Sequence, residues 1–454
     1  MLDSKEWMEQ FEIPHGVGRV LDVLRNAGFE GWLVGGCVRD RLMGRTPNDF
    51  DVATDASAAK VAAAFAGFRV IETGLKHGTV TVLSDGMPVE VTTFRVDGAY
   101  SDGRHPDSVT FTSDIRDDLS RRDFTVNAMA YSPARGFLDE FGGRNDLRDK
   151  VIRCVGDPDR RFGEDALRIL RALRFASRLG FSIEPATADA IHRGRGLLRQ
   201  IAVERITQEL FGILCGGNAG DVMREYSDVM EQIIPPLGRT FSFEQHNPHH
   251  DCDVWEHTLR VVDAAPPERV LRLAALLHDI GKPDCFSSGA DGTGHFYGHA
   301  ARSRALAEGI FEQYLRVDNH TKERVLLLVE RHDERLTPDR RLLRRRLAKY
   351  GEEAVRQLIA LDRADLRGQA RALACDREKE LDETLKMLDE LTAENACLHL
   401  RDLAINGGDL MAMGIPKGPM IGTILSQLLS EVCDEKLSNT REALFSRAAQ
   451  LKEQ

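Results

Sequence analysis

The chain has 454 residues, of which 42% are hydrophobic, 61 are basic and 72 are acidic, giving a formal net charge of −11. At roughly 150 residues per domain this length predicts about three domains, and no apolar run approaches the roughly 18 residues that cross a bilayer, so we expect no membrane span. The net charge argues against a protein that coats nucleic acid by bulk electrostatics.

The N-terminus and the cysteines indicate the compartment. The first ten residues carry three acids and no apolar stretch, so we expect no secretory signal. The closest cysteines, Cys375 and Cys397, are 22 residues apart. This spacing excludes CxxC zinc knuckles and redox pairs, and it predicts reduced thiols in a cytoplasmic protein.

The composition divides the chain into an N-terminal part with strands and a helical remainder. Short apolar strands separated by Gly and Asp turns are typical of an α/β domain and are expected at residues 31–34, 50–52, 79–83, 89–94 and 108–111. From Val151 onward Leu, Ala, Arg and Glu recur at helical spacing. Pro and His clusters between 235 and 250, and a new leucine periodicity after Cys375, mark further boundaries. The predicted domains are 1–150, 151–240, 245–375 and 376–454.

A pair of glycines follows the first strand. Gly35 and Gly36 lead directly into a predicted helix at residues 37–43. Glycines let the backbone approach a ligand closely, and the start of a helix presents free N–H groups. The guanidinium of Arg39 can donate two hydrogen bonds to an anion, so this turn suits a phosphate. An ordinary tight turn is the alternative.

Two aspartates lie on the next predicted strand. Alternation puts Asp49 and Asp51 on one face, about 6.5 to 7 Å apart at Cα, with Phe50 pointing into the core. Such a pair repels itself unless a cation lies between, so the natural occupant is Mg²⁺, or two ions about 3.5 to 4 Å apart as in phosphoryl-transfer enzymes. Glu90, between two valines, is a candidate third carboxylate. The alternative is an exposed strand edge whose acids serve solubility.

Arginine-rich segments supply candidate nucleotide contacts. Arg122 in the RRD triplet at 121–123 can bind a triphosphate while Asp123 accepts from a ribose hydroxyl, unless the triplet merely stabilises a helix start. In the amphipathic segment 163–176, Asp165 and Arg168 at i, i+3 can read a base edge, or can form an intrahelical salt bridge. Two further arginines continue this basic face toward phosphates: Arg171 and Arg174.

Two longer stretches are also basic. Residues 151–206 hold 11 Arg, no Lys and 7 acids, and residues 321–349 hold 10 basic residues and 5 acids. Either stretch could follow a phosphate backbone. The alternative is a solvated helix face whose charges do little.

Seven motifs across residues 31–210 together resemble the bacterial tRNA nucleotidyltransferase family, the CCA-adding enzymes with the related poly(A) polymerases. They are LVGGCVRD, NDFDVAT, VEVTTFR, DGRHPDSV, RRDFTVNAMA, GEDALRILRALRFASRLGF and ERITQEL. The resemblance implies an α+β protein with a polymerase-β-like nucleotidyltransferase head, followed by all-helical RNA-binding, HD and tail segments. It also implies that residues 100–106 form the flexible loop of full CCA-adding members.

The resemblance assigns roles within the head. It implies that Asp49 and Asp51 bind Mg²⁺ and that Gly36 and Arg39 lie near the triphosphate. It places Arg122 and Asp123 near sugar and phosphate, and makes Asp165 with Arg168 a protein template for CTP and ATP. Further nucleotide contacts are implied for Arg171 and Arg174.

The helical half carries a histidine and aspartate series that resembles the HD phosphohydrolase superfamily over about 245–370. Imidazole and carboxylate suit Mg, Mn, Fe, Ni or Zn, whereas buried structural histidines are the alternative for any single position. The candidate ligands of a divalent ion are His257, His278, Asp279 and Asp365, with Asp362 competing for the last place. A second metal is expected near His299 and His332. Some CCA-adding enzymes with this domain hydrolyse 2′,3′-cyclic phosphates or phosphomonoesters.

The predicted function is addition of cytidine, cytidine and adenosine to the tRNA 3′ end from CTP and ATP without a nucleic-acid template. Poly(A) polymerase shares the head motifs and is the rival within the class. From other classes, the rivals are an HD phosphohydrolase with a degenerate head and a tRNA-binding protein without catalysis. Against both stands the observation that every head position with an implied catalytic role is filled.

Overall fold

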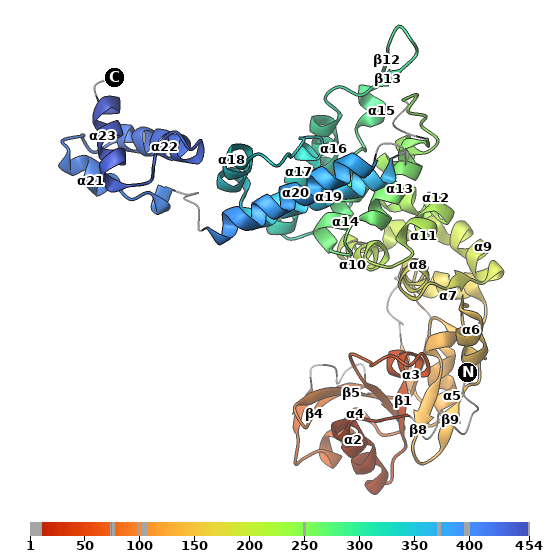
Figure 1. Cartoon of the computed structure of the whole chain (residues 1–454). Coiled ribbons are helices and arrows are strands. Elements are labelled where there is room, and N and C mark those ends of the chain that lie inside the picture. The colour runs from red at the N-terminus through yellow and green to blue at the C-terminus, as the bar shows by residue number, and fades with distance from the viewer. Residues whose placement is uncertain are drawn as a thin grey trace. The chain divides into compact units, whose positions relative to one another are not determined.

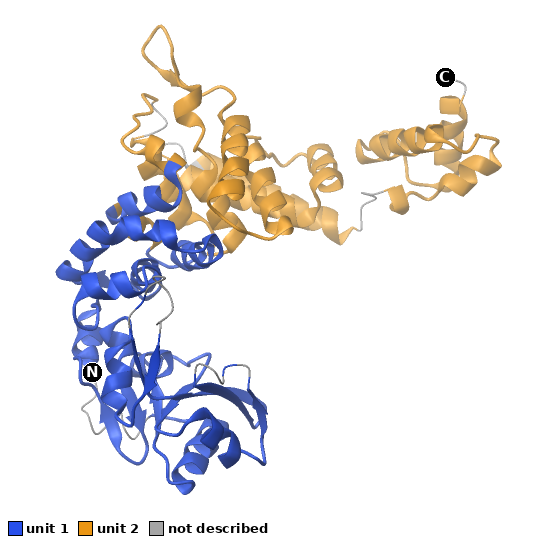
Figure 2. Cartoon of the chain, turned by 180° about the vertical axis from the view of Figure 1, so that it is seen from behind, with its two compact units in different colours: residues 1–218, 225–235 blue, residues 219–224, 236–454 orange. Residues whose placement is uncertain are grey.

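The structure is a computed structural model of the chain and describes residues 11–72, 74, 78–98, 100, 108–247, 251–369, 374–394 and 400–452. The chain divides into two compact units (Figure 2). Unit 1 comprises residues 1–218 and 225–235, and unit 2 comprises residues 219–224 and 236–454.

Unit 1 contains a seven-stranded mixed sheet in the order β3-β4-β5-β2-β1-β8-β9 (Figure 1). Within it β2 and β5 run parallel, and the other neighbours run antiparallel. The strands are β1 (Gly31–Val34), β2 (Asp51–Thr54), β3 (Arg69–Ile71), β4 (Thr79–Ser84), β5 (Met87–Thr93), β8 (Ala130–Ser132) and β9 (Gly136–Leu138). A separate hairpin pairs β6 (Arg95–Asp97) with β7 (Val109–Phe111). All five strands predicted from the sequence are present.

The central strand β1 is covered on both faces. Leu33 lies in a core with helices α2 (His15–Asn26) and α4 (Ala58–Ala64), and Trp32 lies in a second core with α5 (Ile115–Ser120). The β1 sequence is accordingly apolar throughout, whereas β4 and β5 alternate between buried and more exposed residues.

The rest of unit 1 is mainly helical. Helix α8 packs along α10, and α7 packs against α9. The helices are α3 (Gly36–Leu42), α6 (Gly143–Asp149), α7 (Pro158–Glu164), α8 (Leu167–Leu179), α9 (Pro185–Gly194), α10 (Val203–Leu214) and α12 (Ser227–Ile233), with 3-10 turns at Thr125–Asn127 and Arg195–Gln200. A short parallel pair, β10 (Val151–Ile152) and β11 (Ser182–Ile183), interrupts the expected all-helical segment. Two-residue strands leave no period-2 signal in a sequence.

Unit 2 is a helical assembly in which α13 (Val254–Ala264) packs along α19 (Glu352–Gly368), and α14 (Arg269–Leu277) along α17 (Asn319–Arg331). Its other helices are α15 (Lys282–Cys285), α16 (His299–Gln313), α18 (Arg340–Tyr350), α20 (Ala374–Ala393), α21 (Gly407–Ala412), α22 (Pro419–Cys433) and α23 (Arg441–Lys452), with a 3-10 turn at Leu400–Asp402. The predicted glycine-rich loop at 287–294 contains a hairpin of β12 (Ser287–Ser288) and β13 (Gly294–His295). Helix α11 (Ala219–Glu225) and a 3-10 turn at Pro235–Thr240 fall at the unit boundaries.

The basic helix α18 does not present its arginines as a free phosphate-binding face. Arg345 lies 2.6 Å from Asp434, Arg346 lies 2.8 Å from Glu334, and Arg344 lies 3.1 Å from Glu435. Glu334 belongs to the same stretch, so Asp434 and Glu435 offset two of the five excess positive charges of residues 321–349. Within the described part of the chain, none of the helices combines the length and apolarity needed to cross a membrane.

Candidate active site and candidate metal centre

Three carboxylates meet at the centre of the sheet in unit 1. Strand β2 begins at Asp51, which is in register with Glu90 on β5 and with Val34 on β1. Phe50 is 5% exposed and lies in the core, as predicted, while Asp49 precedes the strand and is exposed. Burial, and then the negative charges of Asp49 and Glu90, raise the pKa of Asp51 to about 6. The structure therefore concentrates negative charge where a cation would lower its energy.

The turn after β1 needs glycine at its first position. Gly35 has a φ of 74°, in the left-handed region, and precedes helix α3. A Cβ atom here would lie 2.8 Å from Nη1 of Arg122 and 3.9 Å from Oδ2 of Asp51. The missing side chain lets the Arg122 guanidinium lie between the turn and the carboxylates.

An arginine-rich cavity of about 770 Å³ opens beside these carboxylates. Nine arginines and five aspartates line it among the described residues, so its walls suit an anion that also carries hydrogen-bonding groups. The expected site residues that line it are Gly36, Arg39, Asp49, Asp51, Arg122, Asp123, Asp165, Arg168, Arg171 and Arg174. Glu90 is not part of the lining but lies beside Asp51 in the sheet. One cavity thus brings together residues that are up to 138 positions apart (174 − 36).

Asp123 already has a full set of donors. Arg171 donates to Oδ2 from Nε at 2.8 Å and from Nη2 at 2.6 Å, while Oδ1 accepts from Asn127 and from the N–H of Phe124. Burial raises the pKa of Asp123, but the charge of Arg171 and these hydrogen bonds outweigh it and bring the pKa to about 2. Asp123 therefore fixes Arg171, and a ribose hydroxyl would have to share oxygens that are engaged.

Asp165 and Arg168 are not on one continuous helix, which corrects the expected helical segment 163–176. Helix α7 ends at Glu164, and Asp165 has extended backbone angles, φ −142° and ψ 104°. Its Oδ1 accepts the N–H of Leu167, the first residue of helix α8, at 3.0 Å. A local bond from a short carboxylate to the backbone two residues on competes with helical hydrogen bonding, which accounts for the break.

Each member of this pair has its own partner, so the alternative of a salt bridge between them is wrong. Oδ2 of Asp165 accepts from Nη2 of Arg205 at 3.1 Å, whereas Nη1 of Arg168 donates to Glu164 at 2.7 Å. Arg168 also donates to the Arg121 carbonyl at 3.2 Å. Both side chains are thereby held with their polar ends at the cavity.

Sequence reasoning missed four residues that organise this cavity. Arg205 and Glu164 orient the Asp165 and Arg168 side chains, and Asn127 links Asp123 to Nη1 of Arg39 at 2.6 Å. Phe175 lies under the guanidinium groups of three arginines, 4.9 to 5.6 Å from its ring centre. The motifs contained these residues, but no periodicity links positions 40 residues apart.

The predicted flexible loop falls almost wholly outside the described residues. Of its span, Tyr100 is described, and its hydroxyl donates to Asp97 at 2.8 Å. The role of residues 101–106 therefore stays a prediction.

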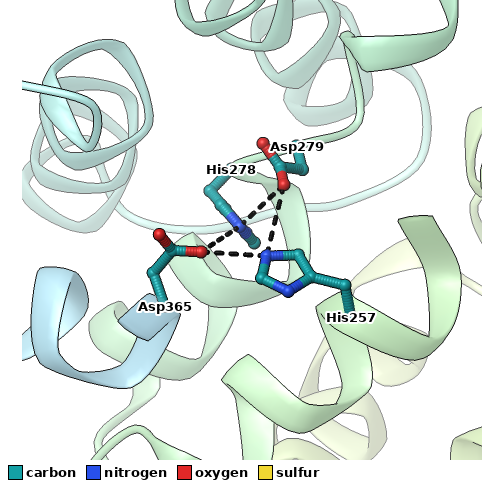
Figure 3. Close-up of side chains that lie close together, drawn as sticks. All are labelled: His257, His278, Asp279 and Asp365. Atoms are coloured by element: carbon teal, nitrogen blue, oxygen red, sulfur yellow. Dashed lines mark ion pairs between the residues drawn. The ribbon is translucent and has the colours of Figure 1, made fainter. Parts of the chain in front are cut away.

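Unit 2 brings the four predicted metal ligands together (Figure 3). One ligand atom from each of His257, His278, Asp279 and Asp365 lies within 4.8 Å of the others. Nε2 of His257 is 2.9 Å from Asp365, and Nε2 of His278 is 3.2 Å from Asp279. The ligands come from helix α13, from the end of α14 and from α19, so only the packing of these helices creates the group.

Of the two candidates for the last ligand position, Asp365 lies with the histidines and Asp362 does not. Asp362 lies one turn earlier on α19 and is paired with Arg377 at 2.5 Å. Asp365 instead faces the two histidines, and its other oxygen accepts from Gln369 at 2.9 Å. The geometry agrees with the choice made from the sequence.

A second group adjoins the first through Asp279. His299 and His332 place their Nε2 atoms 3.4 Å and 3.6 Å from Oδ1 of this aspartate. Their Nδ1 atoms contact backbone carbonyls, at 2.9 Å for His299 and 2.8 Å for His332, which leaves the Nε2 atoms directed at the site. Lys282, which the sequence analysis missed, lies 2.7 Å from Oδ2 of Asp279.

Four family profiles match parts of the chain. The profile described as Poly A polymerase head domain matches residues 31–153, and the HD domain profile matches residues 252–367. Profiles for a probable RNA- and SrmB-binding site of polymerase A and for tRNA nucleotidyltransferase domain 2 match residues 180–237 and 311–448.

Similar proteins cover almost the whole chain. A CCA-adding enzyme of Levilactobacillus brevis is 34% identical over 96% of this chain and 97% of its own, and one of Latilactobacillus sakei is 32% identical over 94% and 96%. The crystal structure of the Bacillus stearothermophilus CCA-adding enzyme in complex with CTP superposes with a TM-score of 0.73, at 28% identity over 96% of this chain and 97% of that one.

The sheet, its carboxylates and the arginine-lined cavity define a nucleotidyltransferase with a polymerase-β-like head, joined to a helical unit that contains an HD domain. Identity above 30% over nearly the full length then specifies which nucleotidyltransferase this is. The chain belongs to the family of CCA-adding enzymes, which are tRNA nucleotidyltransferases.

Proposed function

We propose that this chain adds cytidine, cytidine and adenosine to the 3′ end of tRNA, using CTP and ATP and releasing pyrophosphate. The observation that carries the proposal is the single cavity that is lined both by Asp49 and Asp51 and by nine arginines. The acidic edge suits the reacting phosphoryl group with its cation, and the arginines suit the triphosphate and base.

Asp49 and Asp51 would hold Mg²⁺ in the head, with Glu90 adding negative charge behind Asp51. The donor set fits this ion, since all three groups are carboxylates, and burial together with their mutual repulsion raises the pKa of Asp51. When bound, Mg²⁺ lowers the pKa of the tRNA 3′-hydroxyl and offsets charge on the α-phosphate and the leaving pyrophosphate.

The arginines position the nucleotide. Arg39 and Arg122 lie on the acidic side of the cavity and would bind phosphate oxygens, while Arg171, fixed by Asp123, holds a constant orientation. Gly36 starts α3 without a side chain and leaves room for the phosphates. Arg174, paired with Glu209 at 3.2 Å and stacked on Phe175, continues this wall.

Base selection would fall to Asp165 and Arg168. The carboxylate accepts from an exocyclic amine, which cytosine and adenine share, and the guanidinium donates to a ring nitrogen or carbonyl oxygen. Arg205 binds Asp165 and Glu164 binds Arg168, so Asp165 and Arg168 are not paired with each other. Both side chains can therefore form hydrogen bonds with the edge of one base.

The function is tested by incubating a tRNA transcript that lacks CCA with each nucleotide in turn. We expect CTP alone to extend it by two residues, CTP with ATP by three, and ATP alone to give no long tail. A ladder of many adenosines would instead show a poly(A) polymerase. The products are resolved by denaturing electrophoresis.

Replacing Asp165 by alanine should lower the rate and weaken discrimination against UTP and GTP, since the acceptor for the exocyclic amine is lost. Arg205→Ala should reduce discrimination about tenfold, because a charge-assisted hydrogen bond of about 1.5 kcal/mol then no longer orients Asp165. Single-nucleotide kcat/KM values for the four nucleotides provide the measurement. Arg193→Ala, which removes an exposed ion pair with Asp159, is the matched control. Unchanged preference in Asp165→Ala would assign base reading to another residue.

For unit 2 we propose a second activity, metal-dependent hydrolysis of a phosphate ester. His257, His278, Asp279 and Asp365 would hold a divalent ion, and His299 and His332 with Asp279 a second one. Mixed imidazole and carboxylate donors fit Mn, Fe, Ni or Zn better than Ca. When bound, such an ion polarises the phosphoryl oxygen and activates water. Lys282 adds a fixed positive charge for the phosphate.

A further inference from the structure

An unusually exposed aromatic side chain lies beside the HD residues. Tyr297 is 80% exposed, the highest value for a large hydrophobic side chain in the described ranges. Its ring is stacked on His295, with centroids 5.4 Å apart and an angle of 15° between the planes. One face of the Tyr297 ring packs on His295 and the other is exposed to water. A second flat group can therefore stack on the exposed face without breaking a contact within the protein.

The neighbouring aromatic residues pack against each other. Phe286 lies 5.7 Å from Phe243 and 5.8 Å from Phe296, in tilted or edge-on contacts. Among the described residues, the ring partner of Tyr297 is His295 and not a member of this cluster, so Tyr297 adds little to the packing of the cluster. Stability therefore does not explain its presence.

Chain geometry places Tyr297 next to the metal-ligand groups. His299 follows two residues later, and two residues span at most about 7 Å. The Phe296 carbonyl contacts Nδ1 of His299 at 2.9 Å, and the Phe296 ring lies 5.3 Å from Nζ of Lys282. Lys282 in turn lies 2.7 Å from Asp279, so the segment 295–299 borders the charged site.

We propose that Tyr297, supported by His295, is a stacking platform for the nucleobase of a ligand whose phosphate lies at the HD residues. The ligand class is a nucleoside phosphate, free or at the 3′ end of an RNA. This inference rests on the phosphohydrolase activity proposed above. It adds that the site prefers phosphate esters that carry a nucleobase over those that do not. Aromatic rings accept any base by stacking, so the platform selects for a base rather than for its sequence.

The test measures binding rather than turnover, with the full-length chain loaded with Mn²⁺. No tRNA and no other nucleotide is present, because CTP would itself compete for the platform, and binding of the probe in the cavity of unit 1 should be the same in every Tyr297 variant. The probes are labelled adenosine 3′-phosphorothioate, which is chosen to resist hydrolysis, and ribose 5-phosphate, which has no base. Equilibrium dialysis gives Kd for each.

Tyr297→Ala should raise Kd for the nucleotide about tenfold, whereas Tyr297→Phe should change it less than about twofold, because the ring rather than the hydroxyl does the stacking. The Kd for ribose 5-phosphate should not change in either variant. Tyr314→Ala is the matched control, since Tyr314 follows the C-terminal end of α16, about 22 Å along the helix from His299.

An unchanged nucleotide Kd in Tyr297→Ala, or equal weakening of both probes, would overturn the platform. An RNA octamer ending in the same 3′-phosphorothioate distinguishes the two sources: a larger effect of Tyr297→Ala on the octamer assigns an RNA end, and a larger effect on the mononucleotide assigns a free nucleotide. If Tyr297→Ala weakens nucleotide binding but the wild-type chain does not hydrolyse 2′,3′-cyclic AMP, the proposed activity is contradicted and the proposed role of Tyr297 in base stacking stands.

Discussion

Replacing Asp51 by asparagine should reduce nucleotide incorporation at least a thousandfold. The substitution removes a carboxylate at the point where Asp49 and Glu90 already concentrate negative charge, and so removes the attraction for Mg²⁺. A loss of about 4 kcal/mol of transition-state stabilisation corresponds to about a thousandfold in rate. Single-turnover incorporation of labelled CMP into tRNA measures it.

Affinity for tRNA should remain within about threefold in this variant, because RNA binding depends on cations and counterion release rather than on a buried carboxylate. The fold should also persist: burial and neighbouring carboxylates disfavour the charge on Asp51, so asparagine should not lower Tm in EDTA. Asp22→Asn, which affects an exposed ion pair with Arg25, is the control and should keep near-normal activity. Incorporation by Asp51→Asn above a tenth of the wild-type rate would refute the proposed metal site.

Asp279→Asn should remove metal from unit 2 while CCA addition persists at near the wild-type rate. Asp279 is 2% exposed and belongs to both ligand groups, with Oδ1 toward His299 and His332 and Oδ2 toward His257 and His278. An amide keeps the shape of the side chain but not its charge, so both groups lose a ligand at once. We expect bound Mn²⁺ or Ni²⁺, measured by plasma mass spectrometry after desalting, to fall at least tenfold.

Two further variants separate the groups. Asp365→Asn should weaken only the ion held with His257 and His278, and His332→Ala only the ion held with His299. Hydrolysis of 2′,3′-cyclic AMP with Ni²⁺, Mn²⁺ and Mg²⁺ gives the matching activity profile. If the wild-type chain retains no metal and hydrolyses nothing with these ions, unit 2 is a scaffold and the second activity is withdrawn.

Local patterns in the sequence indicated the candidate residues of both sites. The apolar residue between two acids predicted a buried Phe50 and an exposed Asp49, and the structure has both, although β2 begins only at Asp51 and so strand alternation does not account for them. The order of His and Asp residues between positions 257 and 365 predicted a ligand group in unit 2, and the four side chains do lie together. Residue type and order belong to the chain itself, so these signals need no knowledge of the fold.

Tertiary structure alone decided how those residues are partnered. Asp165 meets Arg205 across 40 positions and Asp123 meets Arg171 across 48, and no local period encodes contacts of that range. The sequence favoured one helix through Asp165, but the structure breaks it there, since its carboxylate accepts from the Leu167 N–H and from Arg205 on α10. Likewise His257, His278 and Asp365 converge only because α13, α14 and α19 pack together, and helix packing depends on the whole set of buried apolar side chains.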